Sequence, residues 1–377
     1  MFYPKCLFFL YALIAISYCQ HAGFTPDFHG YLLDTVGQAT LNLLERKEHS
    51  WGSFGGKLHP DQEIRKQPVL MVHGVATTAG RFLMLRKYLY NKGYTDAELY
   101  ATTWGNGPQG GLVLVKMECR FVRQIRIMID AIHEYTGSRK IDIVAFSMGA
   151  PITRKAILGG DCNGIYLGKP LTHLVDTFVS VAGANYGSAI CEMLPLAICN
   201  LNNGLSCRSH RLSELNSRKH RYEGKHSFSI TTTNDEKVGG WCCGHKCASL
   251  PNNEAEFVYH GPGHDEVLYR SIKLQYELIT KHRGKLSDLQ VSEIPIPPAR
   301  NTMMVLTTNI AKLAVSTTQS EITTSTTTVT PQKSEPTVEL PSWLVGLMEK
   351  EARATLGNFQ ADDHRAESAE NLKWTDY

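Results

Sequence analysis

Residues 141–150, Ile-Asp-Ile-Val-Ala-Phe-Ser-Met-Gly-Ala, decide the fold that we expect for this chain. A buried-strand pattern ends at Ser147, and a helical pattern over 148–158 follows at once. Small residues stand two positions before and two after the serine, at Ala145 and Gly149. This arrangement is typical of a nucleophile elbow, the tight strand-to-helix turn that lifts a serine hydroxyl above the carboxyl end of a sheet. The alternative is an ordinary strand end with a capping serine.

Outward from this turn, the chain alternates between strands and helices. Short apolar or β-branched runs predict six strands, at 69–72, 99–103, 141–146, 175–181, 227–233 and 257–259. Apolar residues spaced by three and four predict helices at 31–44 (weak), 81–91, 112–135, 148–158 and 266–281. No strand is predicted before residue 69. This alternation predicts an α/β protein of the α/β-hydrolase fold, with a mostly parallel sheet of about six strands and helices on both faces.

The N-terminus predicts a secretory signal peptide over residues 1–19. Lys5 precedes an apolar run over 7–16, and Ser17 and Cys19 provide the small residues of a cleavage site. Ten apolar residues are too few to span a bilayer of about 30 Å, although an uncleaved anchor is the alternative. No later stretch reaches spanning length, so we expect a secreted, extracellular protein without an integral membrane segment.

The cysteines support an oxidising compartment. Eight of the ten follow the predicted signal peptide, and six of those fall between residues 191 and 247. Up to four disulfides are expected, but eight cysteines allow 105 pairings and the sequence selects none of them. The motif Cys242-Cys-Gly-His-Lys-Cys247 also fits a zinc site. Disulfides are favoured over a metal because the protein is expected to be secreted.

Composition then divides the chain. Residues 20–284 are predicted to form the catalytic domain, with a Cys-rich insertion at about 185–250. Eleven of the fifteen residues from 316 to 330 are Ser or Thr, so 285–340 is interpreted as a linker or stalk. The tail, 341–377, is expected to be disordered. A formal net charge of +3 gives no electrostatic case for binding nucleic acid.

A serine hydroxyl becomes a good nucleophile when a base takes its proton. Around a nucleophile elbow the groups follow the chain order serine, acid, histidine. His264 fits the base best, because it directly precedes the last predicted helix in the loop after the final strand. His260 in the same loop is the reserve. Three other histidines lie late enough in the chain but fit less well: His245, His282 and His364.

The acid is expected at Asp235, directly after the predicted strand 227–233 and therefore at its carboxyl end. Its carboxylate would orient the imidazole and stabilise the imidazolium. Asp161 resembles a turn residue, and Asp176 precedes its strand and so lies at the wrong end of the sheet. Glu236 is interpreted as a solvated loop charge.

An oxyanion hole needs two backbone N–H donors. Met148, directly after the serine, provides the first. Val75, in the loop that follows the strand 69–72, is expected to provide the second. His73 precedes the serine and is interpreted as structural. This chemistry needs no metal and no organic cofactor.

Four motifs together resemble the signatures of class 2 lipases, a family of small α/β-hydrolases. They are Leu70-Met-Val-His-Gly-Val75, Ala145-Phe-Ser-Met-Gly-Ala150, Thr233-Asn-Asp-Glu-Lys-Val238 and Gly261-Pro-Gly-His-Asp265. Ser53-Phe-Gly-Gly-Lys57 and the run from Glu98 to Gly105 are similar to the secreted nematode branch. The resemblance covers about residues 50–284. It implies a triad of Ser147, Asp235 and His264, with oxyanion donors at Val75 and Met148. The long Cys-rich insertion departs from the minimal bacterial members.

The sequence thus predicts a secreted serine hydrolase that cleaves carboxylic ester bonds of lipids, as a triacylglycerol lipase or a carboxylesterase. Its expected partners are an acyl-ester substrate and, transiently, a lipid interface. One alternative is a catalytically inactive binding module on a hydrolase scaffold. Another is a hydrolase of a different acyl bond, in a phospholipid, wax ester or thioester. The apolar segment 193–198 is interpreted either as a lid or lipid-facing surface, or as part of the core.

Overall fold

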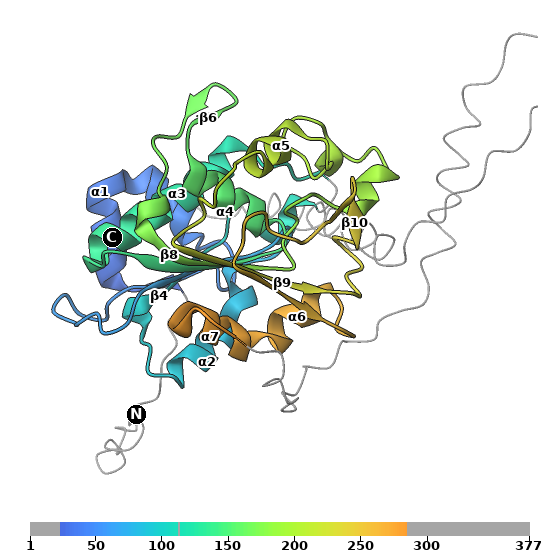
Figure 1. Cartoon of the computed structure of the whole chain (residues 1–377). Coiled ribbons are helices and arrows are strands. Elements are labelled where there is room, and N and C mark those ends of the chain that lie inside the picture. Colours follow the sequence, from blue (N-terminus) through green and yellow to red (C-terminus); the bar gives the residue numbers. More distant parts are fainter. Residues whose placement is uncertain (1–22, 112–113, 285–377) are drawn as a thin grey trace, which may run out of the picture. The chain divides into compact units, whose positions relative to one another are not determined.

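The structure is a computed structural model that describes residues 23–111 and 114–284 (Figure 1). These residues belong to the first of two compact units, Met1–Leu289. Within them, no helix is both long enough and apolar enough to cross a bilayer. Several predicted features lie outside the described residues: the signal peptide (1–19), the linker or stalk (285–340), the tail (341–377) and His364.

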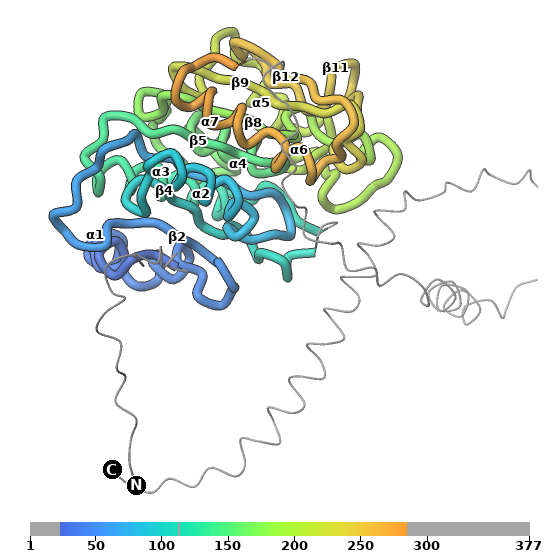
Figure 2. Tube along the Cα trace, turned by 90° about the horizontal axis from the view of Figure 1, so that it is seen from below, coloured from blue at the N-terminus to red at the C-terminus, as the bar shows by residue number. Residues whose placement is uncertain are grey.

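One eight-stranded sheet forms the centre of the unit. Its spatial order is β1-β2-β4-β3-β5-β8-β9-β12, and Figure 2 shows β2 (blue) and β12 (orange) toward opposite sides. Every neighbouring pair is parallel except β2–β4. The strands are β1 (Gly23–Phe24), β2 (Ser53–Gly55), β3 (Val69–Val72), β4 (Leu99–Thr102), β5 (Ile141–Phe146), β8 (Val175–Val181), β9 (His226–Thr232) and β12 (Ala255–Tyr259). The α/β class and the mostly parallel sheet are therefore confirmed.

All six predicted strands are present, but the predicted number of strands was too low. The sheet gains β1 and β2 at one edge, in a region where no strand was expected. These strands are only two and three residues long and contain Gly23 and Gly55. Such short segments carry no hydrophobic period, and their strand conformation comes from pairing with β4 and with each other.

Helices cover both faces of this sheet. In Figure 1, α1, α3, α4 and α5 lie above the sheet, and α2, α6 and α7 lie below it. Their bounds are α1 (Pro26–Glu45), α2 (Leu83–Tyr90), α3 (Cys119–Thr136), α4 (Gly149–Leu158), α5 (His210–Asn216), α6 (His264–Arg270) and α7 (Ile272–Lys281).

Two helix predictions need correction. The helix expected from residue 112 begins at Cys119, and Leu114 is 66% exposed instead of lying on a buried face. The N–H of Met117 donates to the carbonyl of Asn203 at 2.9 Å, so a tertiary contact holds this segment outside the helix. The single helix expected at 266–281 is broken at Ser271 into α6 and α7.

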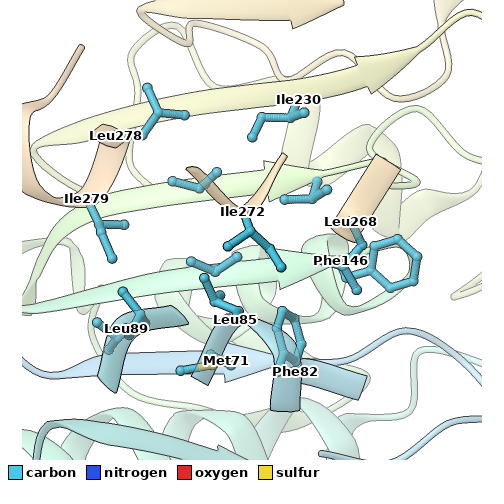
Figure 3. Packing of buried hydrophobic residues seen from close by; sticks show 14 of the residues in the cluster. Met71, Phe82, Leu85, Leu89, Phe146, Ile230, Leu268, Ile272, Leu278 and Ile279 are labelled. Carbon is cyan, nitrogen blue, oxygen red and sulfur yellow. The ribbon is translucent and has the colours of Figure 1, made fainter. Parts of the chain in front are cut away.

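The lower face of the sheet carries a large apolar core (Figure 3). Side chains of α2 and α7, such as Leu85 and Ile272, pack against strand residues that include Met71 and Ile230. All four are at most 4% exposed. Burying such a side chain contributes about 1.5–3 kcal/mol, so this face fixes the strands whose carboxyl ends bear the predicted site.

The predicted Cys-rich insertion is interrupted by β9, which pairs with β8 in the central sheet, so its segments 185–225 and 233–250 lie on either side of that strand in the chain. The eight cysteines of the described residues form four disulfides: Cys119–Cys162, Cys191–Cys199, Cys207–Cys243 and Cys242–Cys247. The last closes the hairpin of β10 (Trp241–Cys242) and β11 (His245–Lys246). The disulfide interpretation of this motif is therefore confirmed, and its sulfurs are not free to bind zinc.

Candidate active site

Ser147 lies in a sharp turn between β5 and α4. Its φ is +55°, a left-handed conformation that is rare for a residue other than glycine. Gly149 is required by the same turn, because a Cβ there would lie 2.3 Å from the carbonyl oxygen of His73. The Ser147 N–H donates to the carbonyl of Val181 at 3.0 Å, which anchors the turn to β8. A strained, anchored turn of this kind presents the hydroxyl in a fixed position.

Three predicted side chains meet at the carboxyl edge of the sheet. His264 Nε2 is 2.9 Å from Ser147 Oγ, and His264 Nδ1 is 2.8 Å from Asp235 Oδ2. The side chains of His264 and Asp235 are each 2% exposed. An ionised Asp235 only accepts hydrogen bonds, so Nδ1 carries the proton and Nε2 accepts from the serine hydroxyl. The arrangement can remove a proton from Ser147.

The carboxylate of Asp235 is held by its own loop. Its Oδ1 accepts hydrogen bonds from the N–H groups of Lys237 and Val238, at 3.1 and 2.8 Å. Glu236 is exposed, as the interpretation of a solvated loop charge expects, and its Oε2 also accepts the backbone N–H of His264 at 2.8 Å. The loop therefore fixes the histidine at both its ring and its backbone.

The residues considered as alternatives to Asp235 and His264 make other contacts or are exposed. Asp161 Oδ1 accepts the N–H of Gly164, as expected of a turn residue. Asp176 pairs with His282 at 3.0 Å. His260 is exposed, and the ring of His245 stacks on Tyr186 with centroids 4.3 Å apart.

The loop after β3 lies directly against the serine. A Cβ on Gly74 would stand 2.8 Å from Ser147 Cβ, so only glycine allows this approach. Val75 follows it at the position expected for the second oxyanion donor. Among the described residues, no group accepts a hydrogen bond from the N–H of Val75 or of Met148. These are the two N–H groups that the sequence predicts as oxyanion donors.

His73 shapes this loop from inside. Its Nδ1 donates to the carbonyl of Gly74 at 2.5 Å, and its Nε2 accepts the N–H of Trp104 at 2.9 Å. The indole Nε1 of Trp104 returns a hydrogen bond to the His73 carbonyl at 2.7 Å. Burial lowers the pKa of His73 to about 3, so the ring stays neutral. Trp104 was missed as part of the site, although it lies in the run 98–105 that suggested the family.

The parallel sheet, the strained serine turn and the helices on both faces define an α/β-hydrolase. The family described as Lipase (class 2) matches residues 66–277, more than half of the chain. The protein therefore belongs to the class 2 lipase family and is a carboxylic ester hydrolase.

Two solved structures illustrate the range of similar proteins. Bacillus licheniformis lipase BlEst2 in its mature form shares 12% identity at a TM-score of 0.44, covering 60% of this chain and 96% of that one. Aspergillus fumigatus lipase B shares 18% identity at a TM-score of 0.45, covering 61% of this chain and 55% of the fungal one.

Proposed function

We propose that this protein hydrolyses lipid esters by a serine-based, two-step mechanism. Ser147 Oγ attacks the ester carbonyl carbon while His264 Nε2 takes the hydroxyl proton. Asp235 stabilises the imidazolium without taking the proton itself. The tetrahedral intermediate then collapses, the C–O bond to the alcohol breaks, and the imidazolium gives its proton to the leaving oxygen. This yields an acyl-enzyme and a free alcohol.

The second step returns the enzyme to its starting state. Water attacks the acyl carbon while His264 takes a proton from that water. The tetrahedral intermediate then collapses, the bond from the acyl carbon to Ser147 Oγ breaks, the imidazolium returns the proton to Ser147 Oγ, and the carboxylic acid leaves. In both steps the N–H groups of Val75 and Met148 are proposed to stabilise the carbonyl oxygen as it becomes negative. Each such donor commonly contributes about 10²–10³-fold to turnover.

A single observation carries this proposal: a continuous chain of contacts at 2.8–2.9 Å joins Asp235, His264 and Ser147. The first experiment measures hydrolysis of p-nitrophenyl esters from short to long acyl chains. We expect Ser147→Ala to abolish turnover, and the chain-length profile to separate esterase from lipase. Ser217→Ala is the matched control, because Ser217 lies exposed at the end of α5. Activity in Ser147→Ala would contradict the mechanism. A folded wild type without activity would favour a binding module or another acyl substrate.

We also propose that the protein is secreted. The four disulfides support this, because such bonds persist in oxidising compartments. Mass spectrometry of protein recovered from the culture medium should find an N-terminus at Gln20. An intact N-terminus on a membrane-bound protein would instead indicate an anchor.

A further inference from the structure

One carboxylate next to His264 connects three loops at the carboxyl edge of the sheet. Asp265 Oδ1 lies 2.5 Å from Arg81 Nη2, and Asp265 Oδ2 lies 2.7 Å from Lys237 Nζ. Arg81 belongs to η1 (Ala79–Phe82), which continues the oxyanion loop after β3. Lys237 comes two residues after Asp235. Asp265 thus joins the histidine loop to the loops of the oxyanion donor and of the acid.

We propose that Arg81 and Asp265 are positioning residues for the reaction at Ser147. Their ion pair fixes the position of His264 relative to the oxyanion loop, and both residues act through the histidine. The inference rests on the proposed function and extends it to Arg81, which lies outside the quoted motifs, and to Asp265, a motif residue that was given no role.

Aromatic contacts support the same role for Arg81. Its guanidinium carbon lies 5.6 Å from the ring centroid of Phe146 and 5.4 Å from that of Tyr269. The Phe146 ring in turn lies 4.9 Å from the imidazole of His264. Arg81 therefore covers the ring of Phe146, against which the imidazole of His264 packs. Phe146 directly precedes Ser147 in the chain. A guanidinium is suited to this place, because it pairs with a carboxylate and an aromatic face at once.

Asp265 and Arg81 carry opposite charges, so they should have opposite effects on the protonated form of His264. Burial raises the pKa of Asp265, but Arg81 and Lys237 outweigh burial and lower that pKa to about 2. Asp265 is therefore ionised throughout the working range of a hydrolase and favours the imidazolium, whereas Arg81 disfavours it. Asp235 and Glu236 accept hydrogen bonds from His264, and Asp265 interacts with it electrostatically. Arg81 and Lys237 pair with Asp265 and complete this group of charges.

The experiment measures kcat and KM for p-nitrophenyl butyrate between pH 4 and 9. Arg81→Gln should lower kcat about tenfold while KM changes less than about twofold, because the histidine and not the substrate loses its support. The acid limb of kcat/KM should move to higher pH in Arg81→Gln and to lower pH in Asp265→Asn. A merely structural role would not move the two limbs in opposite directions.

Two further variants keep the test decisive. Arg81→Lys retains the charge, so it should keep the acid limb in place even if the packing is weaker. Arg270→Gln is the matched control. Arg270 lies in α6, the helix that contains Asp265, and pairs with Glu266 at 2.8 Å on the outer surface of that helix. It should behave as wild type.

Unchanged kinetics in a folded Arg81→Gln variant, or limbs that move in the same direction, would overturn the positioning role alone. Activity that survives Ser147→Ala would overturn the proposed function and this inference together, so the two failures are distinguishable. If Arg81→Gln does not fold, Asp265→Asn and Arg81→Lys still report the direction of the shift.

Discussion

The α/β core and the Cys-rich insertion are stabilised in different ways. The core buries aliphatic side chains such as Leu85 and Ile272 between helices and strands. Outside β9, the Cys-rich region contains one short α-helix, α5, and the hairpin β10–β11, and three of the four disulfides join its segments. These segments also bury apolar side chains, such as Leu205 and Leu212, which help to order them. Covalent links restrict the unfolded chain and take over part of that role.

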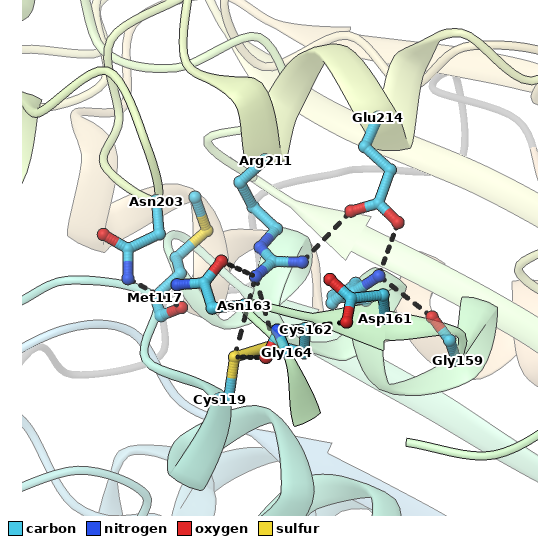
Figure 4. Close-up of a disulfide and its surroundings, with 11 residues drawn as sticks. Met117, Cys119, Gly159, Asp161, Cys162, Asn163, Gly164, Asn203, Arg211 and Glu214 are labelled. Carbon is cyan, nitrogen blue, oxygen red and sulfur yellow. Dashed lines mark hydrogen bonds and ion pairs between the residues drawn. A yellow bond between two sulfur atoms is a disulfide. The ribbon is translucent and has the colours of Figure 1, made fainter. Parts of the chain in front are cut away.

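Buried ion pairs connect these two regions. Arg154 of α4 pairs with Glu223 of the insertion at 2.9 Å, and both side chains are at most 1% exposed. The buried Lys155 pairs with Glu214 at 2.5 Å. Glu214 also pairs with Arg211, whose guanidinium lies 3.0 Å from the sulfur of Cys162 (Figure 4). The insertion is therefore fastened to the helix that begins directly after the nucleophile.

The largest expected effect is a loss of turnover that leaves the stability of both regions unchanged. Asp235→Asn should reduce kcat by about 10⁴-fold, because the imidazole loses its orientation and its stabilising charge. Circular dichroism should show an unchanged fold. Asp161→Asn is the control, since Asp161 is exposed and its Oδ1 accepts the N–H of Gly164. Wild-type turnover in Asp235→Asn would transfer the acid role to Glu236 or Asp176.

A second prediction tests the connection between the regions. Glu223→Gln leaves the charge of Arg154 buried without its partner, so the free energy of unfolding should fall by about 3–5 kcal/mol. Urea unfolding measures this. Glu214→Gln should cost less, because Glu214 is 32% exposed. The double variant Arg154→Met/Glu223→Leu should recover most of the loss. Equal losses for Glu223→Gln and Glu214→Gln would contradict the importance of burial.

A third prediction concerns a buried carboxylate that the core leaves without an ion-pair partner among the described residues. Burial raises the pKa of Asp142 well above its ordinary value and outweighs the hydrogen bonds from Gln67 and Thr177, which lower it. The folded protein therefore binds a proton that the unfolded chain releases, and stability falls as pH rises above about 4.

Asp142→Asn should remove this pH dependence and raise the melting temperature at pH 8 more than at pH 4. The substituted amide can still accept the N–H of Thr177, which donates to Asp142 Oδ1 at 3.1 Å. Melting temperatures of variant and wild type across this range provide the measurement. Parallel pH profiles would show that Asp142 is ionised in the folded state.

The smallest expected effect concerns substrate choice. In the segment 193–198, Met193 is 59% exposed and Ile198 is buried, so part of it presents apolar surface. Deleting residues 190–200 removes both Cys191 and Cys199, so it leaves no half of that disulfide unpaired. If this segment is a lid, the deletion should change acyl-chain preference several-fold, whereas an unchanged profile would exclude that role. Met193→Ser tests the exposed side chain with the disulfide intact.

Much of the core could be predicted because its signals are local. The strands at 69–72, 141–146 and 175–181 have the predicted bounds, since a strand buried on both faces shows as a continuous apolar run. The elbow combines such a strand with Ala145 and Gly149 within five residues. The order serine, acid, histidine then reduced the candidates to three side chains that the structure brings into contact.

Other features depended on partners far away in the chain. β2 is a strand because β4 pairs with it, and α3 begins late because Met117 bonds to Asn203. The 105 disulfide pairings were equivalent in sequence, and only the folded chain brings the right sulfurs together. The ion pair of Arg81 with Asp265 spans 184 residues, so no local pattern announces it.

The sequence by itself determined the alternation of strands and helices, the elbow at Ser147, and the residue types that predict a serine hydrolase. Tertiary structure decided the two edge strands, the disulfide pairing, the buried ion pairs of Arg154 and Lys155, and the contacts that fix His264. The reason is physical. Hydrophobic periodicity and tight turns are encoded by neighbouring residues, whereas pairing between distant residues is settled only when packing of the core brings them within reach.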